Sequence, residues 1–388
     1  METNPLTAAE QTEQTTPIKE TKPTEQTKPT EQTKQTKQTK QTKPTEQTKP
    51  TTGLTLGKFA PLQKGHQLMI EKALRENDEV IVIIYDSPEV TDIPLPVRAG
   101  WIRTLYPAVQ VIEAWGGPSE TGYTREIEAS HEDYIIRLLD GRTITNFYSS
   151  ERYGEHMSVA LGAVNRQVDP QRIRVPVSGT RVRQDPYAER RYVDPVVYRD
   201  LIARVVLLGA PSTGKTTLTA HLAARHHTVW MPEYGREYWA EHQIGRRVTK
   251  EQLVEIAEGH AAREDEMAAD ARRFLFVDTD ARTTLQFSMD YYGEALPRLH
   301  ELADAAATRY DLVFVCDTDI PYDDTWDRSG DVKRQLFQKQ ILADLHMRRI
   351  PYILLQGTLQ QRAARADAVL AKLRKYRSLY EMFAQTDM

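Results

Sequence analysis

The sequence predicts an α/β protein with two doubly wound parallel-sheet domains that follow a disordered N-terminal tail. Apolar runs rich in β-branched residues alternate with amphipathic stretches from Gly53 onward, which is typical of a parallel sheet covered by helices. This alternation occurs in two successive series, and a chain of 388 residues is long enough for two domains and a tail. We therefore expect domains at residues 53–196 and 200–388, behind a tail at residues 1–52.

The tail is expected to be disordered because its composition cannot form a core. It repeats Thr, Glu, Gln, Lys and Pro, and the first aromatic residue of the chain is Phe59. Its eight lysines are nearly balanced by seven glutamates, which argues against a basic arm that binds nucleic acid. No segment before Gly53 leaves space for a helix-turn-helix. We expect a solvated tail and no nucleic-acid partner.

The overall composition excludes a strong electrostatic field of one sign over the whole protein. The 51 lysines and arginines and the 55 aspartates and glutamates give a formal net charge of -4, so phosphate binding must be local. The chain has neither an apolar signal core nor a run that could span a bilayer, so we expect a cytoplasmic protein without a membrane partner. Cys316, in the apolar run LVFVCDT, is expected to be a buried structural thiol. Whether the chain forms a homo-oligomer stays open.

Each expected strand is an apolar run with β-branched or aromatic residues, as strands of parallel sheets are. In the first domain, strands are expected at residues 54–58, 79–85, 109–114, 143–150 and 173–178, with helices at residues 66–75 and 128–139. In the second domain, strands are expected at residues 203–210, 228–233, 274–280, 312–318 and 352–357. The junction between the two series is expected near residues 194–200.

The second series opens with a phosphate-binding loop. The run GAPSTGKTT matches the pattern G-x-x-x-x-G-K-[ST], follows the strand VVLL and precedes the helical stretch TTLTAHLAARH. Glycines let backbone N–H groups surround nucleotide phosphates, while Lys215 reaches the outer phosphates and Thr216 supplies a hydroxyl to Mg²⁺. We predict an ATP and Mg²⁺ site formed by these residues: Gly209, Ser212, Thr213, Gly214, Lys215, Thr216 and Thr217.

Charged residues follow two further strands of this series. Asp278 and Asp280 end the run FLFVDTD, where a carboxylate can hold the magnesium shell or accept a proton from a substrate hydroxyl. Which of them does which stays open, and one of the two could instead cap the helix that begins near Ala281. Glu233 and Arg236 follow another strand, at the edge where open α/β sheets bind ligands, as substrate contacts or as a structural ion pair.

The polar run DTWDRSGDVKRQ contains three cations, namely Arg328, Lys333 and Arg334. Because it leads into a helix, it is suited to a lid that closes over the transferred phosphate, and we assign Arg328 to ATP binding. A solvated loop is the alternative interpretation for each of these residues.

The first series also opens with an anion-binding position, because the run GKFAPLQKGH lies between a strand and a helix. The candidate ATP contacts of this run are Gly57, Lys58, Phe59, Gln63 and Gly65, and His66 at the helix entry is the catalytic candidate. The run VSGTRVR supplies a second set after the last expected strand, namely Ser178, Thr180 and Arg183. Together the two segments could grip one triphosphate from two sides.

These motifs together resemble the NadR-type bifunctional nicotinamide-nucleotide adenylyltransferase and ribosylnicotinamide kinase family. The resemblance rests on Gly57-x-Phe59-x-Pro61-x-x-x-Gly65-His66, Ser178-x-Thr180-x-x-Arg183 and the phosphate loop, and it extends to EYGREYW, VDTDARTT and Arg328-Ser329-Gly330. It covers the chain from Gly53 to about its C-terminus. It implies a Rossmann-like adenylyltransferase that joins NMN to the adenylyl group of ATP, followed by a P-loop kinase that phosphorylates nicotinamide riboside.

The resemblance also implies residue roles. His66 would contact the ATP phosphates around the bond that breaks, while Ser178 and Arg183 hold the β and γ phosphates. The NMN phosphate would attack the α phosphorus and release pyrophosphate, so catalysis is positioning plus charge stabilisation with Mg²⁺. Trp115, in the run EAWGG, is a candidate to stack on the pyridinium ring, and a core or rim position is the alternative.

Two features depart from the family pattern. Relatives read His-x-Gly-His where this chain has Gln63-Lys64-Gly65-His66. Some members carry a DNA-binding helix-turn-helix where this chain has its tail, so we expect no regulator role. The leading interpretation is a NAD salvage enzyme with both activities. One alternative is a kinase whose first domain is a weak or inactive regulatory module that binds NAD or NMN, and another is a non-enzymatic P-loop switch.

Overall fold

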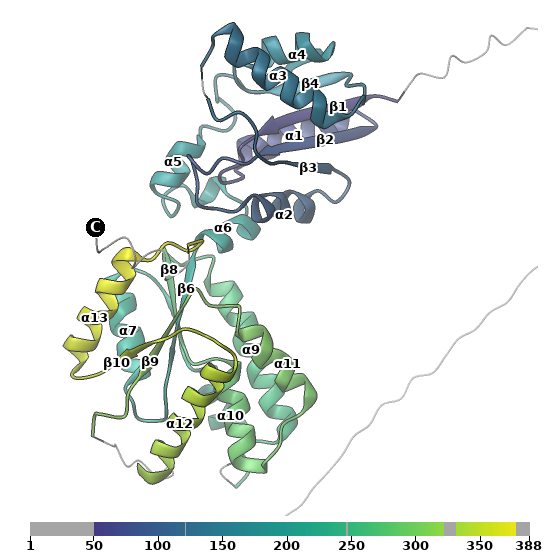
Figure 1. The fold of residues 1–388 in the computed structure, drawn as a ribbon. Helices are drawn as coiled ribbons and strands as arrows, with labels where there is room; N and C mark the ends of the chain where they lie inside the picture. Colours follow the sequence, from purple (N-terminus) through teal and green to yellow (C-terminus); the bar gives the residue numbers. More distant parts are fainter. Residues whose placement is uncertain (1–49, 121, 246, 322–330, 378–388) are drawn as a thin grey trace, which may run out of the picture. The chain divides into compact units, whose positions relative to one another are not determined.

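The computed structural model describes residues 50–120, 122–245, 247–321 and 331–377, so the expected tail lies almost wholly outside the described residues. Within these ranges the named strands form two five-stranded sheets, and all strand pairs are parallel (Figure 1). No helix in the described ranges is long and apolar enough to cross a membrane. The predicted α/β class with parallel sheets is confirmed.

The first sheet has the strand order β3-β2-β1-β4-β5. Its strands are β1 (Thr52–Gly57), β2 (Glu79–Tyr85), β3 (Gln110–Ala114), β4 (Asn146–Ser149) and β5 (Val164–Gln167). The helices of this part are α1 (Lys64–Glu76), α2 (Leu95–Leu105), α3 (Arg125–Leu139), α4 (Gly154–Leu161), α5 (Gly179–Gln184) and α6 (Pro195–Leu201), with a 3₁₀ turn at Arg190–Tyr192. The strand order reverses between β1 and β4, so a ligand crevice is expected at the carboxyl ends of these strands.

The second sheet has the strand order β10-β9-β6-β8-β7. Its strands are β6 (Ala203–Leu208), β7 (Trp230–Met231), β8 (Phe274–Asp278), β9 (Leu312–Cys316) and β10 (Ile353–Leu355). Its helices are α7 (Lys215–Arg225), α8 (Tyr234–His242), α9 (Lys250–Met267), α10 (Ala281–Tyr292), α11 (Pro297–Ala306), α12 (Asp331–Met347) and α13 (Leu359–Lys372). The central strand β6 therefore delivers the phosphate-loop sequence directly to the carboxyl edge of the sheet.

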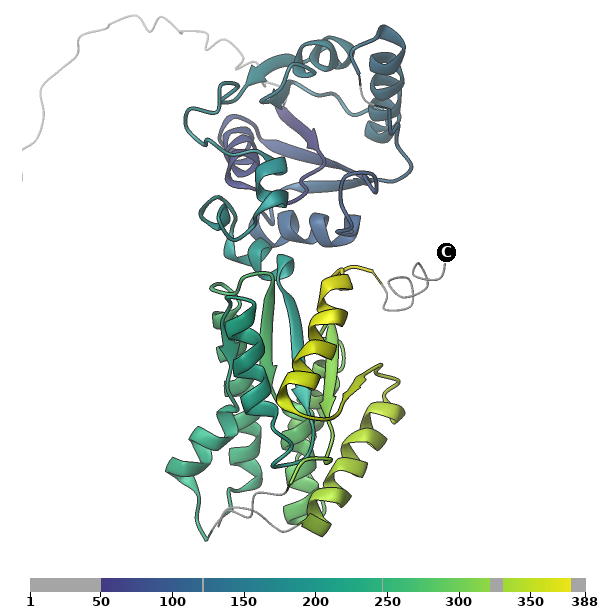
Figure 2. The same cartoon turned by 90° about the vertical axis from the view of Figure 1, so that its left-hand side faces the viewer.

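Helices cover both faces of each sheet, which Figure 2 shows from a second direction. In the first sheet, alternate residues of β1 and β2, such as Leu54 and Ile81, face α3 and α4, while Val80 and Val82 face α1 and α2. In the second sheet, Phe274 and Phe276 face α7 and α13, and the other face packs against α12. The inner strands are apolar on both faces because helices cover both sides, whereas the edge strand β5 is largely exposed.

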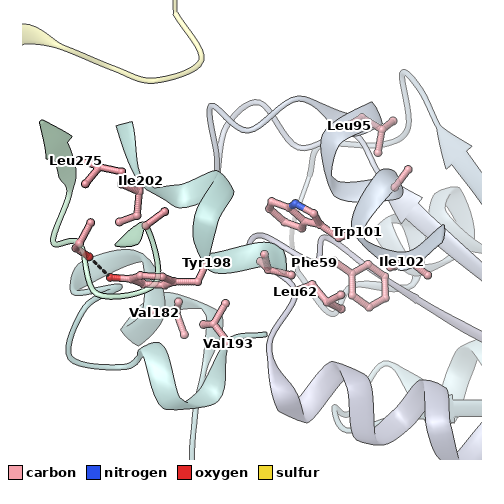
Figure 3. Close-up of a cluster of buried hydrophobic side chains, with 14 of the residues drawn as sticks. Phe59, Leu62, Leu95, Trp101, Ile102, Val182, Val193, Tyr198, Ile202 and Leu275 are labelled. Atoms are coloured by element: carbon pink, nitrogen blue, oxygen red, sulfur yellow. Dashed lines mark hydrogen bonds between the residues drawn. The ribbon is translucent and has the colours of Figure 1, made fainter. Parts of the chain in front are cut away.

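The loop that leaves β1 is anchored by its own apolar side chains. Phe59 and Leu62 are almost fully buried beside Trp101 and Ile102 of α2, as Figure 3 shows. Phe59 has a φ angle of 43°, a conformation that a bulky residue rarely adopts, so burial of the ring must offset the backbone strain. The anion-binding run is thus fixed to the sheet through its hydrophobic positions.

One expected strand is wrong. Residues 173–178 form no strand, and β5 is Val164–Gln167 instead. The carboxylate of Asp169 accepts hydrogen bonds from the backbone N–H groups of Ile173, Arg174 and Val175, so these donors bond to a side chain and not to a neighbouring strand. Ile173 is exposed, whereas Val177 of the same run is buried in the core without being part of a strand.

Cys316 is buried at the end of β9, and burial raises the pKa of its thiol to about 11. A thiol that stays protonated and inaccessible is a poor nucleophile. The interpretation of Cys316 as a buried structural residue is confirmed.

We predict that Thr55→Val stabilises the protein. Thr55 lies fully buried in β1, and its hydroxyl has no hydrogen-bond partner among the described residues. Valine has nearly the same shape without the polar group, so the free energy of unfolding should rise by about 1 kcal/mol, which urea denaturation would measure. Thr219→Val is the matched control and should give no gain, because the Thr219 hydroxyl donates to the backbone oxygen of Lys215 at 2.8 Å. A loss of stability in Thr55→Val would show that an internal water satisfies the hydroxyl.

Candidate functional site

The first candidate site is built around the start of α1. Gln63 is the N-cap residue, and its Oε1 accepts a hydrogen bond from the backbone N–H of Gly65 at 2.6 Å. A Cβ atom at Gly65 would lie 2.8 Å from that Oε1, so only glycine lets the amide fold over the helix end. Because Oε1 is bonded to the helix, the Nε2 end of the Gln63 amide is its donor end.

His66 completes the cap from the other side. Its Nδ1 accepts a hydrogen bond from the backbone N–H of Gln63 at 3.3 Å, and its ring packs edge-on against Phe59. Burial, with the charge of Arg172, lowers the pKa of His66 to about 4, so the ring is neutral at pH 7. Since Nδ1 accepts a hydrogen bond, the proton of the neutral ring is on Nε2. His66 therefore has one ring N–H that can donate to a bound anion.

The structure brings the second motif to the first. Arg183 of α5 donates from Nη1 to the backbone oxygen of Ala60 at 2.7 Å and from Nη2 to the hydroxyl of Thr180 at 3.2 Å. Ser178 caps α5, because its hydroxyl accepts from the N–H of Arg181. The two segments predicted to grip one triphosphate therefore lie side by side.

Other candidate residues of the first domain have fewer contacts. Gly57 ends β1, and the Lys58 ammonium pairs with Glu89 at 2.8 Å. Trp115 follows β3 and is 56% exposed, which excludes the core position and leaves its ring accessible. The backbone oxygen of Trp115 accepts from the Tyr134 hydroxyl at 2.9 Å, so its main chain is held while the indole is free to contact a ligand.

Arg98 is a residue of this region that the sequence reasoning missed. Its guanidinium is 1% exposed and donates to the backbone oxygens of Lys58 at 2.6 Å, Tyr85 at 2.8 Å and Ile93 at 3.0 Å. One buried cation therefore ties the loop after β1 to the loop after β2. An arginine among the apolar residues of the run LPVRAGWI was the only available signal.

The second candidate site begins where β6 ends. Gly209 has a φ angle of 141°, and a Cβ atom there would lie 2.6 Å from the backbone oxygen of Cys316. Gly214 has a φ angle of 78° and is the N-cap of α7. The loop thus needs both glycines, one for close approach to β9 and one for the left-handed turn into the helix.

The polar side chains of the loop differ in burial and in hydrogen bonding. Lys215 is buried, and its ammonium donates to the backbone oxygen of Ala210 at 3.0 Å, as does the buried hydroxyl of Thr213 at 2.8 Å. Ser212 has a φ angle of 61°, and its hydroxyl is buried without a partner among the described residues. Thr216 and Thr217 are exposed in the first turn of α7.

Asp278, the last residue of β8, lies next to this loop. Its Oδ2 accepts from the Thr216 hydroxyl at 2.5 Å, while Oδ1 is buried with no partner among the described residues. Burial raises the pKa of Asp278 to about 6; the charge of Lys215 opposes this shift and that of Glu233 adds to it. A hydroxyl beside an unsatisfied carboxylate oxygen is a donor set that suits Mg²⁺. The described residues hold no group of three or more His, Cys, Asp or Glu that could bind a metal, so phosphate oxygens and water would supply the other ligands.

Asp280 is placed differently from Asp278. It is the N-cap of α10: its Oδ1 accepts from the N–H of Arg282 at 2.9 Å, and its Oδ2 accepts from the Arg282 guanidinium at 2.8 Å. Both oxygens of this buried carboxylate therefore already hold donors. The helix-cap interpretation holds for Asp280 and leaves Asp278 as the carboxylate with a free oxygen.

Glu233 follows β7 after Pro232 and is the N-cap of α8, at the carboxyl edge of the sheet. Its Oε2 lies 3.6 Å from Nε of Arg236, which is the ion pair considered as an alternative to substrate binding. This pair leaves Arg236 largely exposed, so the ion pair does not remove either side chain from ligands.

The expected lid is only partly described. Arg328 lies outside the described residues, and Lys333 is exposed on α12. Arg334 is buried and donates to the backbone oxygens of Thr318 at 2.9 Å and Ile320 at 3.2 Å. Arg334 therefore binds the protein backbone.

Two residues that support the phosphate loop were not identified from the sequence. Arg362 of α13 is buried and donates to the backbone oxygens of Thr213 at 2.6 Å and Gly357 at 3.0 Å. Gln338 of α12 accepts from the N–H of Ala210 at 2.8 Å and donates to the backbone oxygen of Cys316 at 3.1 Å. Both lie in helices that are far from the loop in sequence, and the spacing of residues in those helices does not indicate a contact with the loop.

We predict that Asp278→Asn stabilises the ligand-free protein in a pH-dependent way. Because burial raises the pKa of Asp278 from 3.8 to about 6, the unfolded state ionises first as the pH rises, and the wild-type protein loses stability between these values. Asparagine does not titrate, so its advantage should grow from about pH 4 to about pH 6 and stay level above. Urea denaturation at a series of pH values would measure it. An advantage of equal size at both ends of this range would show that the pKa is not raised.

This chain is similar in sequence to one family model and to NadR proteins of two bacteria. Residues 204–362 match a family model described as an AAA domain. The trifunctional NAD biosynthesis/regulator protein NadR of Escherichia coli (strain K12) is 27% identical over 325 residues, which cover 78% of this chain and 78% of that protein. The protein of the same name from Salmonella typhimurium (strain LT2) is 28% identical over 329 residues, again with 78% of each chain covered.

Two solved structures of NadR proteins share the fold. A crystal structure in complex with NAD and AMP-PNP has a TM-score of 0.52 and 20% identity, and it covers 84% of this chain and 97% of that chain. A crystal structure in complex with NR has a TM-score of 0.52 and 21% identity, and it covers 84% of this chain and 98% of that chain. These matches do not favour the alternative of a kinase with an inactive first domain. They confirm the resemblance carried by the motifs, since the relatives of this chain along most of its length are NadR-type proteins of NAD biosynthesis.

Proposed function

We propose that this protein makes NAD from nicotinamide riboside in two ATP-dependent steps. The second domain, residues 200–388, phosphorylates nicotinamide riboside to NMN, and the first, a Rossmann-like domain at residues 53–196, adenylylates NMN. The proposal is supported by two separate loops, each of which leads from the carboxyl end of the central strand of its own sheet to the start of a helix, a position suited to anions. The similarity to NadR along 78% of the chain supports the choice of substrates.

For the kinase step, the neighbourhood of the phosphate loop supports the residue roles. Lys215 and the loop N–H groups would bind the outer phosphates of ATP, and Thr216 with Asp278 would hold Mg²⁺, which neutralises charge on those phosphates. The riboside hydroxyl attacks the γ phosphorus, the bond to ADP breaks, and a carboxylate takes the hydroxyl proton. We assign this base to Glu233, because Asp278 is beside Thr216 and Asp280 is bonded to Arg282.

For the adenylyl transfer, the cap of α1 supports the residue roles. His66 would donate from Nε2 to the phosphates around the breaking bond, while Gln63 donates from Nε2 of its amide. Arg183 and Ser178 would hold the β and γ phosphates from α5, and Trp115 would stack on the pyridinium ring. The NMN phosphate attacks the α phosphorus and pyrophosphate leaves, so the protein positions the reactants and stabilises charge.

The direct test is to incubate the pure protein with ATP, Mg²⁺ and nicotinamide riboside and to identify products by mass. NMN should form first and NAD after it. ATP binding without turnover of any small riboside would favour a nucleotide-gated switch instead.

We predict that the two activities are separable by single substitutions. Lys215→Ala should abolish riboside phosphorylation and spare the conversion of NMN to NAD, whereas His66→Ala should do the reverse, because each residue contacts only its own loop. Separate assays that start from nicotinamide riboside or from NMN would measure this. If either substitution removed both activities in a folded protein, the two-site proposal would be wrong.

We also predict that Gln63→His increases the rate of NAD formation several-fold. Bound triphosphate would favour the imidazolium cation, which an amide cannot form. Because both ring nitrogens of this cation carry protons, it donates to phosphate and gives up the cap on the Gly65 N–H. The charge-assisted hydrogen bond adds roughly 1 kcal/mol, or somewhat under tenfold in rate. Steady-state assays from NMN and ATP across about pH 6 to 8 would compare both proteins, with the kinase step as the unchanged control. Absence of NAD formation by both proteins, with an active kinase, would make the first domain a binding module.

A further inference from the structure

His260 is a buried histidine of α9 that none of the motifs includes. It is 5% exposed, on a helix that packs against β7, α8 and α10. The preceding residue, Gly259, approaches the ring of Tyr234 so closely that a Cβ atom would lie 2.6 Å from Tyr234 Cε1. Tyr234 directly follows Glu233, so this contact places His260 next to the start of α8, at the carboxyl end of β7.

The surroundings of His260 are charged on several sides. Burial lowers the pKa of His260 to about 4; the charges of Asp280 and Glu233 oppose this shift, and those of Arg309 and Arg263 add to it. Burial raises the pKa of Asp278 on β8 and of Tyr291 on α10, and the charge of Glu233 adds to both shifts. These groups that interact with Glu233 thus come from β8, α9 and α10, and the neutral imidazole of His260 is the one from α9.

One atom of this histidine lacks a partner. Nε2 of His260 is buried and makes no hydrogen bond with any of the described residues. Buried polar atoms of native proteins are almost always satisfied, and an unsatisfied one costs stability in the free protein. A binding group can tolerate that cost when a ligand supplies the missing hydrogen bond, as happens in pockets where a few polar atoms fix the orientation of a ligand.

We propose that His260 binds the phosphoryl acceptor of the kinase step, through a hydrogen bond between Nε2 and a hydroxyl or carboxamide group of the riboside. This inference rests on the proposed function, since it assigns a specificity-determining residue to the same site. ATP is not the partner that the geometry favours, because its phosphates are expected at the loop between β6 and α7, whereas the residue before His260 contacts Tyr234, the neighbour of Glu233.

The test compares His260→Leu and His260→Gln with the wild-type protein. Leucine removes an unpartnered polar group, so the melting temperature of the ligand-free protein should stay equal or rise. The KM for nicotinamide riboside should rise about tenfold, while the KM for ATP stays within about twofold. Glutamine keeps a hydrogen-bonding group of similar reach and should recover part of the loss.

His226, the C-cap residue of α7, provides a matched control. Its Nε2 lies 2.9 Å from Oδ1 of Asp367, so this histidine already has a protein partner. His226→Leu should therefore lower the melting temperature and leave the KM for the riboside unchanged. A raised KM without loss of melting temperature in His260→Leu, with the reverse in His226→Leu, would show that His260 contacts the ligand and that His226 has a structural role.

Riboside analogues that lack the 2′-hydroxyl, the 3′-hydroxyl or the carboxamide identify the contacted group. The analogue without that group should lose affinity for the wild-type protein and lose little further in His260→Leu. A lower melting temperature with unchanged KM in His260→Leu would overturn the inference and indicate an internal water or a structural role. If the wild-type protein phosphorylates no riboside, the proposed function itself fails, which is a different result from an active kinase with an unaffected His260 variant.

Discussion

The loop after the first strand of each sheet depends on a buried guanidinium that binds one of its backbone oxygens. Arg98 holds the backbone oxygen of Lys58 after β1, and Arg362 holds that of Thr213 after β6, each at 2.6 Å. Burial of a cation costs free energy unless hydrogen bonds replace its water shell, and backbone oxygens from several segments do so here. Each loop is therefore fixed by a group that comes from a different part of the chain.

This arrangement explains why both loops can present N–H groups to an anion. A peptide unit has its C=O and N–H on opposite sides, so a carbonyl turned towards a buried arginine directs the next N–H the other way. Phe59 follows Lys58, and Gly214 follows Thr213, and both adopt positive φ angles. The guanidinium contacts therefore help to hold these two residues in backbone conformations that the loop sequences alone would not fix.

Much of the fold could be predicted because apolar runs and turns are local signals. The strands from β1 to β4 and from β6 to β10 lie within or next to the runs from which they were predicted, because parallel strands covered on both faces need continuous apolar sequence. Residues 173–178 have the same composition but not the same structure, since Asp169 takes their N–H groups. That competition is local, since Asp169 lies only four to six residues before these N–H groups, but the apolar composition of the run does not reveal it.

The candidate sites show the same division. The phosphate loop and Gln63–His66 lie at helix starts as predicted, because glycine and cap positions are encoded nearby. The distinction between Asp278 and Asp280 could not be predicted, since it depends on whether Thr216 or Arg282 lies next to each carboxylate. His260 was missed because a histidine in a helix has no spacing that separates a ligand contact from a core position.

The short edge strands of the second sheet bear on aggregation at high protein concentration. Its edge strands are short, with two residues in β7 and three in β10. An edge strand exposes unpaired N–H and C=O groups that can template pairing with another molecule, and short edges offer too few of them for a stable ladder. A sheet whose interior is almost continuously apolar is thus protected against edge-to-edge aggregation by the brevity of its outer strands.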